Sequence, residues 1–156
     1  MAYEQLKLSN QLCFRFYTIS RLITKSYTPL LERLDLTYPQ YLTMLVLWEK
    51  DHQPVNTIGH RLGLRTNTMT PLLRRLEENG YIMRMGSNND HRKIIVSLTE
   101  KGVRLQERAK TIPEDLVNKI TENGGFNLSE LNNMFGSLDT MIDRLRYVTG
   151  EANEVE

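Results

Sequence analysis

The sequence has only one cysteine, Cys13, among its 156 residues. A single thiol cannot form an intramolecular disulfide, which fits a reducing, cytoplasmic setting. No apolar run approaches the roughly 18 residues needed to span a bilayer, and residues 1–10 lack the basic and apolar segments of a secretory signal. We therefore expect a cytoplasmic protein that has no membrane partner.

Motifs of metal, cofactor and hydrolytic chemistry are also absent. His52, His60 and His91 lack the spacing of a helical metal site, and each is more simply a surface residue. The sequence has neither a phosphate-binding glycine loop nor the nucleophile elbow of hydrolases. We therefore expect a protein that binds no metal and no cofactor and is not an enzyme. The enzymatic alternative is a thiol peroxidase, which would need sustained turnover at Cys13.

The charge is nearly balanced over the whole chain but not along it. The formal net charge is +1, whereas residues 61–93 hold seven basic and three acidic residues, a local net charge of +4. The remaining residues therefore sum to −3. The basic residues of this segment are Arg61, Arg65, Arg74, Arg75, Arg84, Arg92 and Lys93. A basic middle between less basic flanks indicates one face that meets a polyanion.

Helical periodicity covers both ends of the chain. We expect a first helix over residues 9–27, capped by Ser9 and interrupted by Pro29, and a second that Thr37 caps. Residues 41–50 are apolar almost all round, as in a buried helix. After Thr99 we expect a helix to about residue 121, with a kink at Pro113, and a last helix over residues 127–147.

The middle of the chain predicts a helix-turn-helix followed by a hairpin. A short helix over residues 55–62 precedes a turn at Gly63 and a third helix, which begins near Thr66 and ends at residues 79–80. Apolar strands over residues 81–85 and 93–98 flank a polar loop, which predicts a β-hairpin wing. The expected fold is mainly α with a small β-hairpin wing, a winged helix-turn-helix.

The terminal helices have apolar stripes that need a partner. We expect residues 1–36 and 112–156 to form a helical dimerisation region around a DNA-binding domain at residues 37–111. Such a homodimer would read a pseudo-palindromic operator in double-stranded DNA, with half-sites about one helical turn apart.

The expected DNA contacts surround the start of the third helix. Short polar side chains there reach phosphates or base edges, arginines pair with phosphate or guanine, and Arg92 at the wing suits a narrow minor groove. Taken singly, each arginine is more simply a solvated surface charge. Together on one winged module they favour DNA. The candidates are Arg65, Thr66, Asn67, Thr68, Thr70, Arg74, Arg75, Arg84, Arg92 and Lys93.

Two sets of motifs resemble the MarR family of transcriptional regulators. One is the wing sequence Asp90-His91-Arg92 with residues 96–102, and the other is the helix sequence at residues 68–77. Within that family the chain resembles the organic-hydroperoxide-sensing OhrR-type repressors, over about residues 6–112. The residues that carry this second resemblance are 10–14, Tyr17, Tyr27, 29–31 and 36–41.

The resemblance implies a winged-helix homodimer that represses transcription. Cys13 matches the peroxide-reactive cysteine, Tyr27 and Tyr38 match tyrosines that hydrogen-bond its sulfur, and Tyr17 matches another pocket residue. Asp90 and Arg92 match the wing tip that enters the minor groove. One departure is Arg65-Thr66-Asn67, where the family commonly has Asp-Ser-Gly. This departure should raise non-specific phosphate affinity, so the family's operator is not transferred.

Spacing adds a physical argument about the sulfur. Cys13 and Tyr17 share a helix face, whereas Tyr27 lies roughly 21 Å farther along the same helix. Only Tyr27 of a second, antiparallel chain could therefore reach Cys13. The thiolate attacks peroxides, phenols that donate to it stabilise its charge, and apolar neighbours favour an organic hydroperoxide.

Oxidation of Cys13 would then release the DNA. With no second cysteine, the sulfenic acid reacts with a low-molecular-weight thiol, cyclises with a backbone nitrogen or oxidises further. We expect Tyr27 and Tyr38 to lose their bonds to sulfur and the two reading heads to shift. Two alternatives are a MarR-type repressor released by an aromatic carboxylate or phenol, and a Cys13 that is merely a small buried apolar residue.

Overall fold

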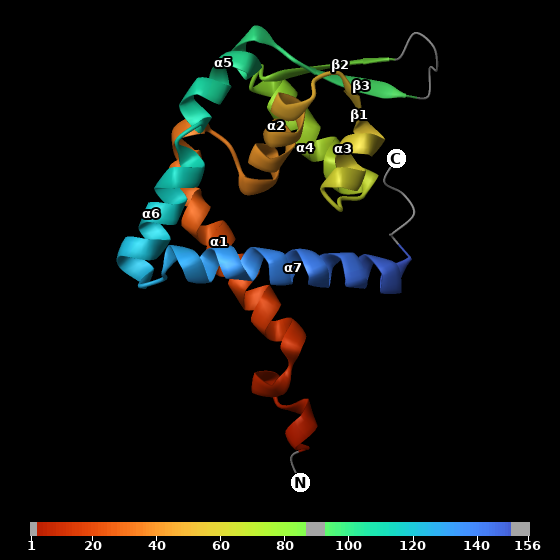
Figure 1. Cartoon of the computed structure of the whole chain (residues 1–156). Coiled ribbons are helices and arrows are strands. Elements are labelled where there is room, and N and C mark those ends of the chain that lie inside the picture. The colour runs from red at the N-terminus through yellow and green to blue at the C-terminus, as the bar shows by residue number, and fades with distance from the viewer. Residues whose placement is uncertain (1–2, 87–92, 151–156) are drawn as a thin grey trace. The chain divides into compact units, whose positions relative to one another are not determined.

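The computed structural model describes residues 3–86 and 93–150. They form two compact units, residues 1–113 and 114–156 (Figure 1). The first unit contains η1 (Glu4–Leu6), η2 (Leu8–Asn10), α1 (Leu12–Leu31), η3 (Glu32–Leu34), α2 (Tyr38–Glu49), β1 (Gln53–Pro54), α3 (Val55–Arg61), α4 (Thr66–Glu78), β2 (Ile82–Gly86), β3 (Ile94–Leu98) and α5 (Glu100–Ala109). Helix α6 (Ile112–Gly124) begins at the boundary, and α7 (Leu128–Thr149) lies in the second unit.

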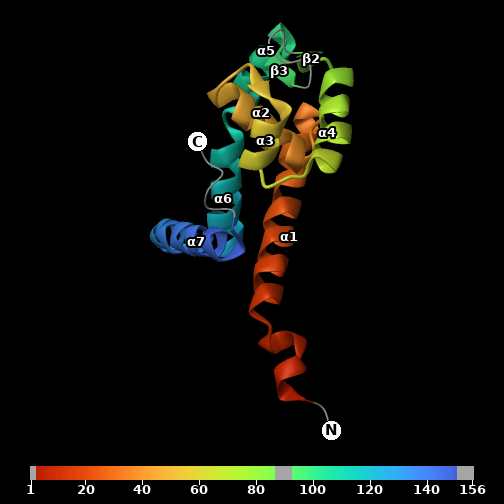
Figure 2. The same ribbon diagram turned by 90° about the vertical axis from the view of Figure 1, so that its right-hand side faces the viewer.

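Helix α1 differs at both ends from the predicted helix. It begins at Leu12 after Gln11, and Ser9 lies in η2, so the expected cap at Ser9 is wrong. It also runs through Pro29, where an interruption was predicted, and continues into η3. A proline in the last turn removes only one helical hydrogen bond, and burial of Leu30 and Leu31 holds that turn on the core. Figure 2 shows α1 leading away from α2, α3 and α4.

Helix α2 is the centre of the first unit, as its sequence predicts. Thr37 and Gln40 form a capping box, in which the Gln40 side chain accepts from the Thr37 amide at 2.7 Å. Met44 and Leu47 are fully buried. The half-buried Trp48 donates from Nε1 to the carbonyl oxygen of Gly102 at 3.0 Å, which ties α2 to α5.

The helix-turn-helix is confirmed as α3 and α4. Gly63 makes the turn with a φ of 62°, a conformation that glycine adopts without strain. The predicted inward residues of α4 are all buried: Met69, Leu72, Leu73 and Leu76. At the end of α4 only Gly80 is left-handed, with a φ of 73°, whereas Asn79 keeps a helical conformation.

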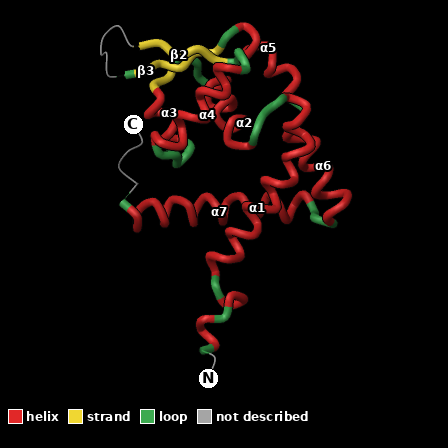
Figure 3. Tube along the Cα trace, turned by 180° about the vertical axis from the view of Figure 1, so that it is seen from behind, coloured by secondary structure: helices red, strands yellow, loops and turns green. Residues whose placement is uncertain are grey.

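The predicted hairpin is confirmed as β2 and β3, which pair antiparallel from Ile82 opposite Leu98 to Gly86 opposite Ile94. The sheet has a third strand, β1, so the order is β1-β3-β2. Two residues are too few for a sequence pattern, and β1 was not predicted. Figure 3 shows the three strands together beside α3 and α4. The loop that contains Asp90 and Arg92 lies outside the described residues.

The single helix predicted after Thr99 is wrong, because α5 ends at Ala109 and α6 begins at Ile112. Pro113 explains the break: it has no amide for the Ala109 carbonyl, but it is well tolerated in the first turn of α6. Thr99 caps α5 as expected and accepts from the Gly102 amide at 3.0 Å. The last helix is confirmed as α7, capped by Asn127.

We predict that Gly102→Ala destabilises the first unit. A Cβ atom at Gly102 would lie 2.0 Å from the Tyr81 carbonyl oxygen, so the start of α5 must move away from the wing. Overpacking of this kind costs about 1–3 kcal/mol, to be measured as the free energy of unfolding in urea. Gly86→Ala is the control, because nothing lies within 4 Å of its added Cβ. Equal stability of the two variants would contradict the contact.

Candidate nucleic-acid interface and thiol site

The start of α4 presents a polar, positively charged surface. Arg65 is the N-cap residue, and Thr66, Asn67, Thr68 and Thr70 occupy the first turns; all five are exposed. The Thr70 hydroxyl donates to the carbonyl oxygen of Thr66 at 3.0 Å. Because the first amides of a helix are unpaired and carry partial positive charge, this end of α4 suits a phosphate group.

Two of the predicted arginines are held in ion pairs on or beside α4. Arg74 pairs with Glu78 one turn later, at 2.9 Å between Nε and Oε1. Arg84, in β2, pairs with Glu77, at 2.6 Å between Nη2 and Oε2. Hydrogen bonds from Arg84 hold the pKa of the Glu77 carboxyl below its usual range. Arg75 and Lys93 are exposed. The sequence pattern showed these charges but not their pairing.

A hollow of about 200 Å³ lies between α4 and the wing strands. It brings together four of the predicted residues, Thr66, Thr70, Arg84 and Lys93, with Asn56 of α3. The remaining lining residues are Pro54, Val55, Leu73 and Ile94.

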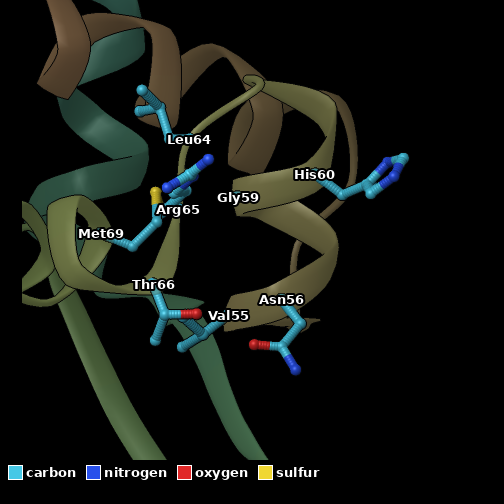
Figure 4. A pocket seen from close by; sticks show the side chains of 8 residues that line it. All are labelled: Val55, Asn56, Gly59, His60, Leu64, Arg65, Thr66 and Met69. Carbon is cyan, nitrogen blue, oxygen red and sulfur yellow. The ribbon is translucent and has the colours of Figure 1, made fainter. Parts of the chain in front are cut away.

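A second hollow, of about 250 Å³, lies between α3 and the start of α4. Figure 4 shows its lining, with Asn56 and His60 from α3 and Arg65, Thr66 and Met69 from the α4 side; the His60 ring points away from the others. Val55, Gly59 and Leu64 complete it. Asn56 lines both hollows, and sequence analysis missed it, although its place at the start of the first helix of the pair was available as a signal.

Cys13 is the second residue of α1 and is exposed within the chain. The alternative of a small buried apolar residue is therefore not what the single chain shows. The first turn of a helix favours a negative charge, and Cys13 lies closer to that end than a cap at Ser9 would have placed it. Tyr17 is 58% exposed, and the Arg21 guanidinium carbon lies 5.7 Å from its ring centroid.

The structure brings Tyr27 and Tyr38 together, away from Cys13. Their ring centroids are 4.8 Å apart, and Tyr41 lies 5.9 Å from Tyr27. Tyr41 also meets Trp48 edge-on at 6.5 Å. Because α1 is continuous from Cys13 to Tyr27, the two residues are roughly 21 Å apart along one chain. Tyr41 was not among the predicted residues, since an apolar helix hides which of its rings meets the tyrosine pair.

All three phenols of this cluster stay protonated at neutral pH. Burial raises the pKa of Tyr27 to about 12, with further contributions from the neighbouring phenols of Tyr38 and Tyr41. Burial also raises the pKa of Tyr38 and of Tyr41. Each hydroxyl therefore remains a hydrogen-bond donor.

We predict an alkaline loss of stability that depends on Tyr27. Its folded pKa of about 12 exceeds the unfolded value of about 10, so the neutral phenol stabilises the fold below pH 10. That stability should fall as pH rises from about 10 towards 12, and Tyr27→Phe should flatten the fall. Urea unfolding at a series of pH values measures it. The control is Tyr147→Phe, because Tyr147 is 80% exposed; equal slopes for both variants would count against the cluster.

Metal and membrane signals are absent from the part of the chain that the structure describes. Among residues 3–86 and 93–150, no group of three or more His, Cys, Asp and Glu side chains could hold a metal ion. None of the helices described is both long and apolar enough to cross a membrane.

The sequence matches known regulators over most of its length. The family described as "Transcriptional regulator SarA/Rot" matches residues 25–108. The organic hydroperoxide resistance transcriptional regulator of Bacillus subtilis (strain 168) is 41% identical over 143 residues, 92% of this chain and 95% of that protein. The regulator SarZ of Staphylococcus haemolyticus is 33% identical over 86% of this chain and 89% of its own length.

Solved structures agree with these matches. AbfR of Staphylococcus epidermidis is 38% identical, with a TM-score of 0.70 over 91% of this chain and 95% of that chain. Overoxidised AbfR bound to DNA is 36% identical, with a TM-score of 0.71 over 93% and 98%. A MarR-family regulator from Rhodococcus, at 20% identity and a TM-score of 0.75 over 87% and 95%, shares the fold. The chain therefore belongs to the SarA/Rot family of winged-helix transcriptional regulators, with the organic hydroperoxide resistance regulator among its relatives.

Proposed function

We propose that this protein is a DNA-binding transcriptional repressor that senses organic hydroperoxides by oxidation of Cys13 and then releases its operator. The observation that carries the proposal is the exposed Cys13 in the first turn of α1, the only thiol in the sequence. Its relatives support oxidation of a cysteine as the trigger: one is a regulator of organic hydroperoxide resistance, and AbfR has been solved in reduced, disulfide and overoxidised forms, of which the reduced and the overoxidised forms are bound to DNA. A repressor of this kind acts in the cytoplasm.

DNA binding is assigned to residues 37–111, with α4 as the recognition helix. Residues 1–36 and 112–156 join two copies, so that two recognition helices read the two halves of a pseudo-palindromic operator. In this proposal the DNA contacts are the exposed residues at the start of α4 together with the arginines and the wing. They are Arg65, Thr66, Asn67, Thr68, Thr70, Arg74, Arg75, Arg84 and Lys93, with Asp90 and Arg92 from the loop outside the described residues.

The sensing reaction is a two-electron oxidation of sulfur. The Cys13 thiolate attacks the terminal oxygen of the hydroperoxide, and an S–O bond forms as the O–O bond breaks. The sulfur becomes a sulfenic acid, and the alkoxide that leaves takes up a proton to become the alcohol. The sulfenic acid then reacts with a low-molecular-weight thiol, a backbone nitrogen or a second peroxide. Tyr17 shares the Cys13 face, and Tyr27 and Tyr38 of a second copy donate to the sulfur before oxidation.

The reaction is a single turnover rather than enzymatic catalysis in this proposal. Its relatives are transcriptional regulators, and the chain has no second cysteine to regenerate the thiol. The hollow between α4 and the wing strands favours a second candidate, release by a small aromatic carboxylate that binds there.

A release assay separates the two candidates. The protein selects a duplex from a random-sequence library, and fluorescence anisotropy follows that duplex after addition of one equivalent of an organic hydroperoxide, its alcohol or an aromatic carboxylate. We expect only the hydroperoxide to release the DNA. Release by the carboxylate, with none by the hydroperoxide, would replace thiol oxidation by ligand binding.

We predict that Arg65→Asp weakens non-specific DNA binding. Each phosphate contact contributes about 0.9 to the slope of log affinity against log salt, so removing one should reduce the slope by about 1. Anisotropy titrations of an unrelated duplex at several salt concentrations measure it. Arg104→Asp is the control, because it makes the same charge change on α5 rather than on α4. An unchanged slope for Arg65→Asp would exclude a phosphate contact.

A further inference from the structure

Glu77 is an acidic residue on the recognition helix, where an acid should oppose DNA. Its carboxylate receives three hydrogen bonds from Arg84 of β2. The Arg84 amide donates to Oε1 at 3.1 Å, and its Nε and Nη2 donate to Oε2 at 3.0 and 2.6 Å. The contact therefore joins α4 to the wing strand through both the backbone and the side chain of Arg84.

We infer that Glu77 is a positioning residue for DNA binding. Its hydrogen bonds with Arg84 hold the wing at a fixed place beside the recognition helix. The inference rests on the proposed DNA-binding function and deepens it. It also changes the role of Arg84, because Nε and Nη2 are engaged by Glu77. Arg84 then serves the interface first by fixing β2, and only its Nη1 edge stays outside the pair.

The geometry favours positioning over a mere surface ion pair. An exposed pair within one helix orders nothing beyond its own side chains and contributes little. This pair connects two elements, its side chains are only 26% and 37% exposed, and Nε and Nη2 converge on the single oxygen Oε2, which restricts the guanidinium. The amide bond adds a backbone group of the wing itself. Since a wing and a recognition helix must meet adjacent grooves together, fixing their relative place reduces the ordering that binding requires.

The next residue provides a matched control. Glu78 is also an acid on α4 and also pairs with an arginine, Arg74, at 2.9 Å. Both members of that pair belong to α4, and they are 48% and 73% exposed. Glu77→Gln and Glu78→Gln therefore remove the same charge from the same helix, but only Glu77→Gln separates the helix from the wing.

Charge and positioning predict opposite changes in DNA affinity for Glu77→Gln, but not for Glu78→Gln. By charge alone, each substitution should tighten DNA binding, since one repulsion of the phosphate backbone is lost. By positioning, Glu78→Gln leaves the affinity unchanged or tighter, while Glu77→Gln weakens it by roughly fivefold or more. In an Arg84→Met background both guanidinium bonds are gone, and the remaining backbone bond can also be accepted by a glutamine at position 77, so adding Glu77→Gln should tighten binding. A reversal of sign between the two backgrounds is specific to the Glu77–Arg84 pair.

The experiment measures the affinity of the full-length variants for the duplex selected by the wild-type protein, at one fixed salt concentration. Glu77→Asp is included because it keeps the charge and shortens the reach; it should also weaken binding, and it provides the test if Glu77→Gln does not fold. Glu77→Gln binding as tightly as Glu78→Gln, or Glu77→Asp binding like the wild type, would overturn the inference.

Amide hydrogen exchange without DNA distinguishes this inference from the proposed function. The Arg84 amide should exchange faster in Glu77→Gln than in Glu78→Gln, because its acceptor is weakened. Faster exchange in a protein that binds no DNA would refute the proposed function and support the contact between Glu77 and Arg84. If the protein binds DNA, but the Arg84 amide exchanges equally in both variants and the effect of Glu77→Gln on affinity does not reverse, the proposed function stands and the positioning role of Glu77 is refuted.

Discussion

Replacing Cys13 by serine is expected to leave DNA binding intact and to abolish release by organic hydroperoxide. Serine keeps the size and the exposed place in the first turn of α1 but cannot be oxidised at its side chain. The wild type should lose the duplex after one equivalent of oxidant, whereas the variant should hold it at many equivalents. Anisotropy of the selected duplex measures both.

Relocation of the thiol is the control for this prediction. Cys13→Ser combined with Ser20→Cys moves the sulfur seven residues along α1 to another exposed position. The chain keeps one thiol and the same mass. The relocated thiol should not restore release, because it lies away from the first turn and from the tyrosines of a second copy. Release of the Cys13→Ser variant by hydroperoxide would show that another group senses the oxidant.

Replacing Ile142 by glutamate is expected to separate the dimer and with it most of the DNA affinity. Helix α7 exposes an apolar stripe in the single chain, made of Leu128, Phe135, Leu138, Met141, Ile142 and Leu145. A buried charge in such a stripe is costly unless it is paired. Linking two reading heads raises affinity by roughly 10² to 10⁴, so a monomer should bind the duplex at least about 10²-fold more weakly.

Sedimentation and DNA binding on the same samples test this second prediction. Thr140→Glu is the matched control: it puts the same charge on α7, but Thr140 lies two residues from Ile142 and therefore nearly opposite on the helix. The control should remain dimeric and bind normally. A dimeric Ile142→Glu variant with wild-type affinity would mean that α7 does not join the copies.

Local patterns were enough to predict the winged helix-turn-helix. The helical spacing of Met69, Leu72, Leu73 and Leu76 defines the buried face of α4, and the turn at Gly63 separates α4 from α3. These signals are local because each depends on residues within two helical turns. The same holds for the cap at Thr37, whose partner is three residues away.

Features that depend on distant residues could not be predicted in this way. Pro29 reads as a break, yet the burial of Leu30 and Leu31 on the core carries the helix past it. Strand β1 exists only because Gln53 and Pro54 meet Val96 and Ile95 of β3. The sequence does not distinguish a kinked helix from a broken one at Pro113, so it could not predict that α5 and α6 are separate helices.

The candidate sites show the same division. Exposed polar residues at the start of α4 follow from helix periodicity, as does the shared face of Cys13 and Tyr17. The grip of Glu77 on Arg84 and the meeting of Tyr27 with Tyr38 and Tyr41 join separate elements, so only the folded chain shows them. Arg84 is among the predicted DNA contacts because a lone arginine in a basic segment gives no sign of its partner.

The central claim is that oxidation of Cys13 and release of DNA are one event. The most direct measurement takes intact mass and DNA anisotropy from the same sample as an organic hydroperoxide is added up to one equivalent, with and without a small thiol. We expect the fraction of chains that carry one added oxygen or one thiol adduct at Cys13 to follow the fraction of DNA released. Release of the DNA while the mass at Cys13 stays unchanged would contradict the account.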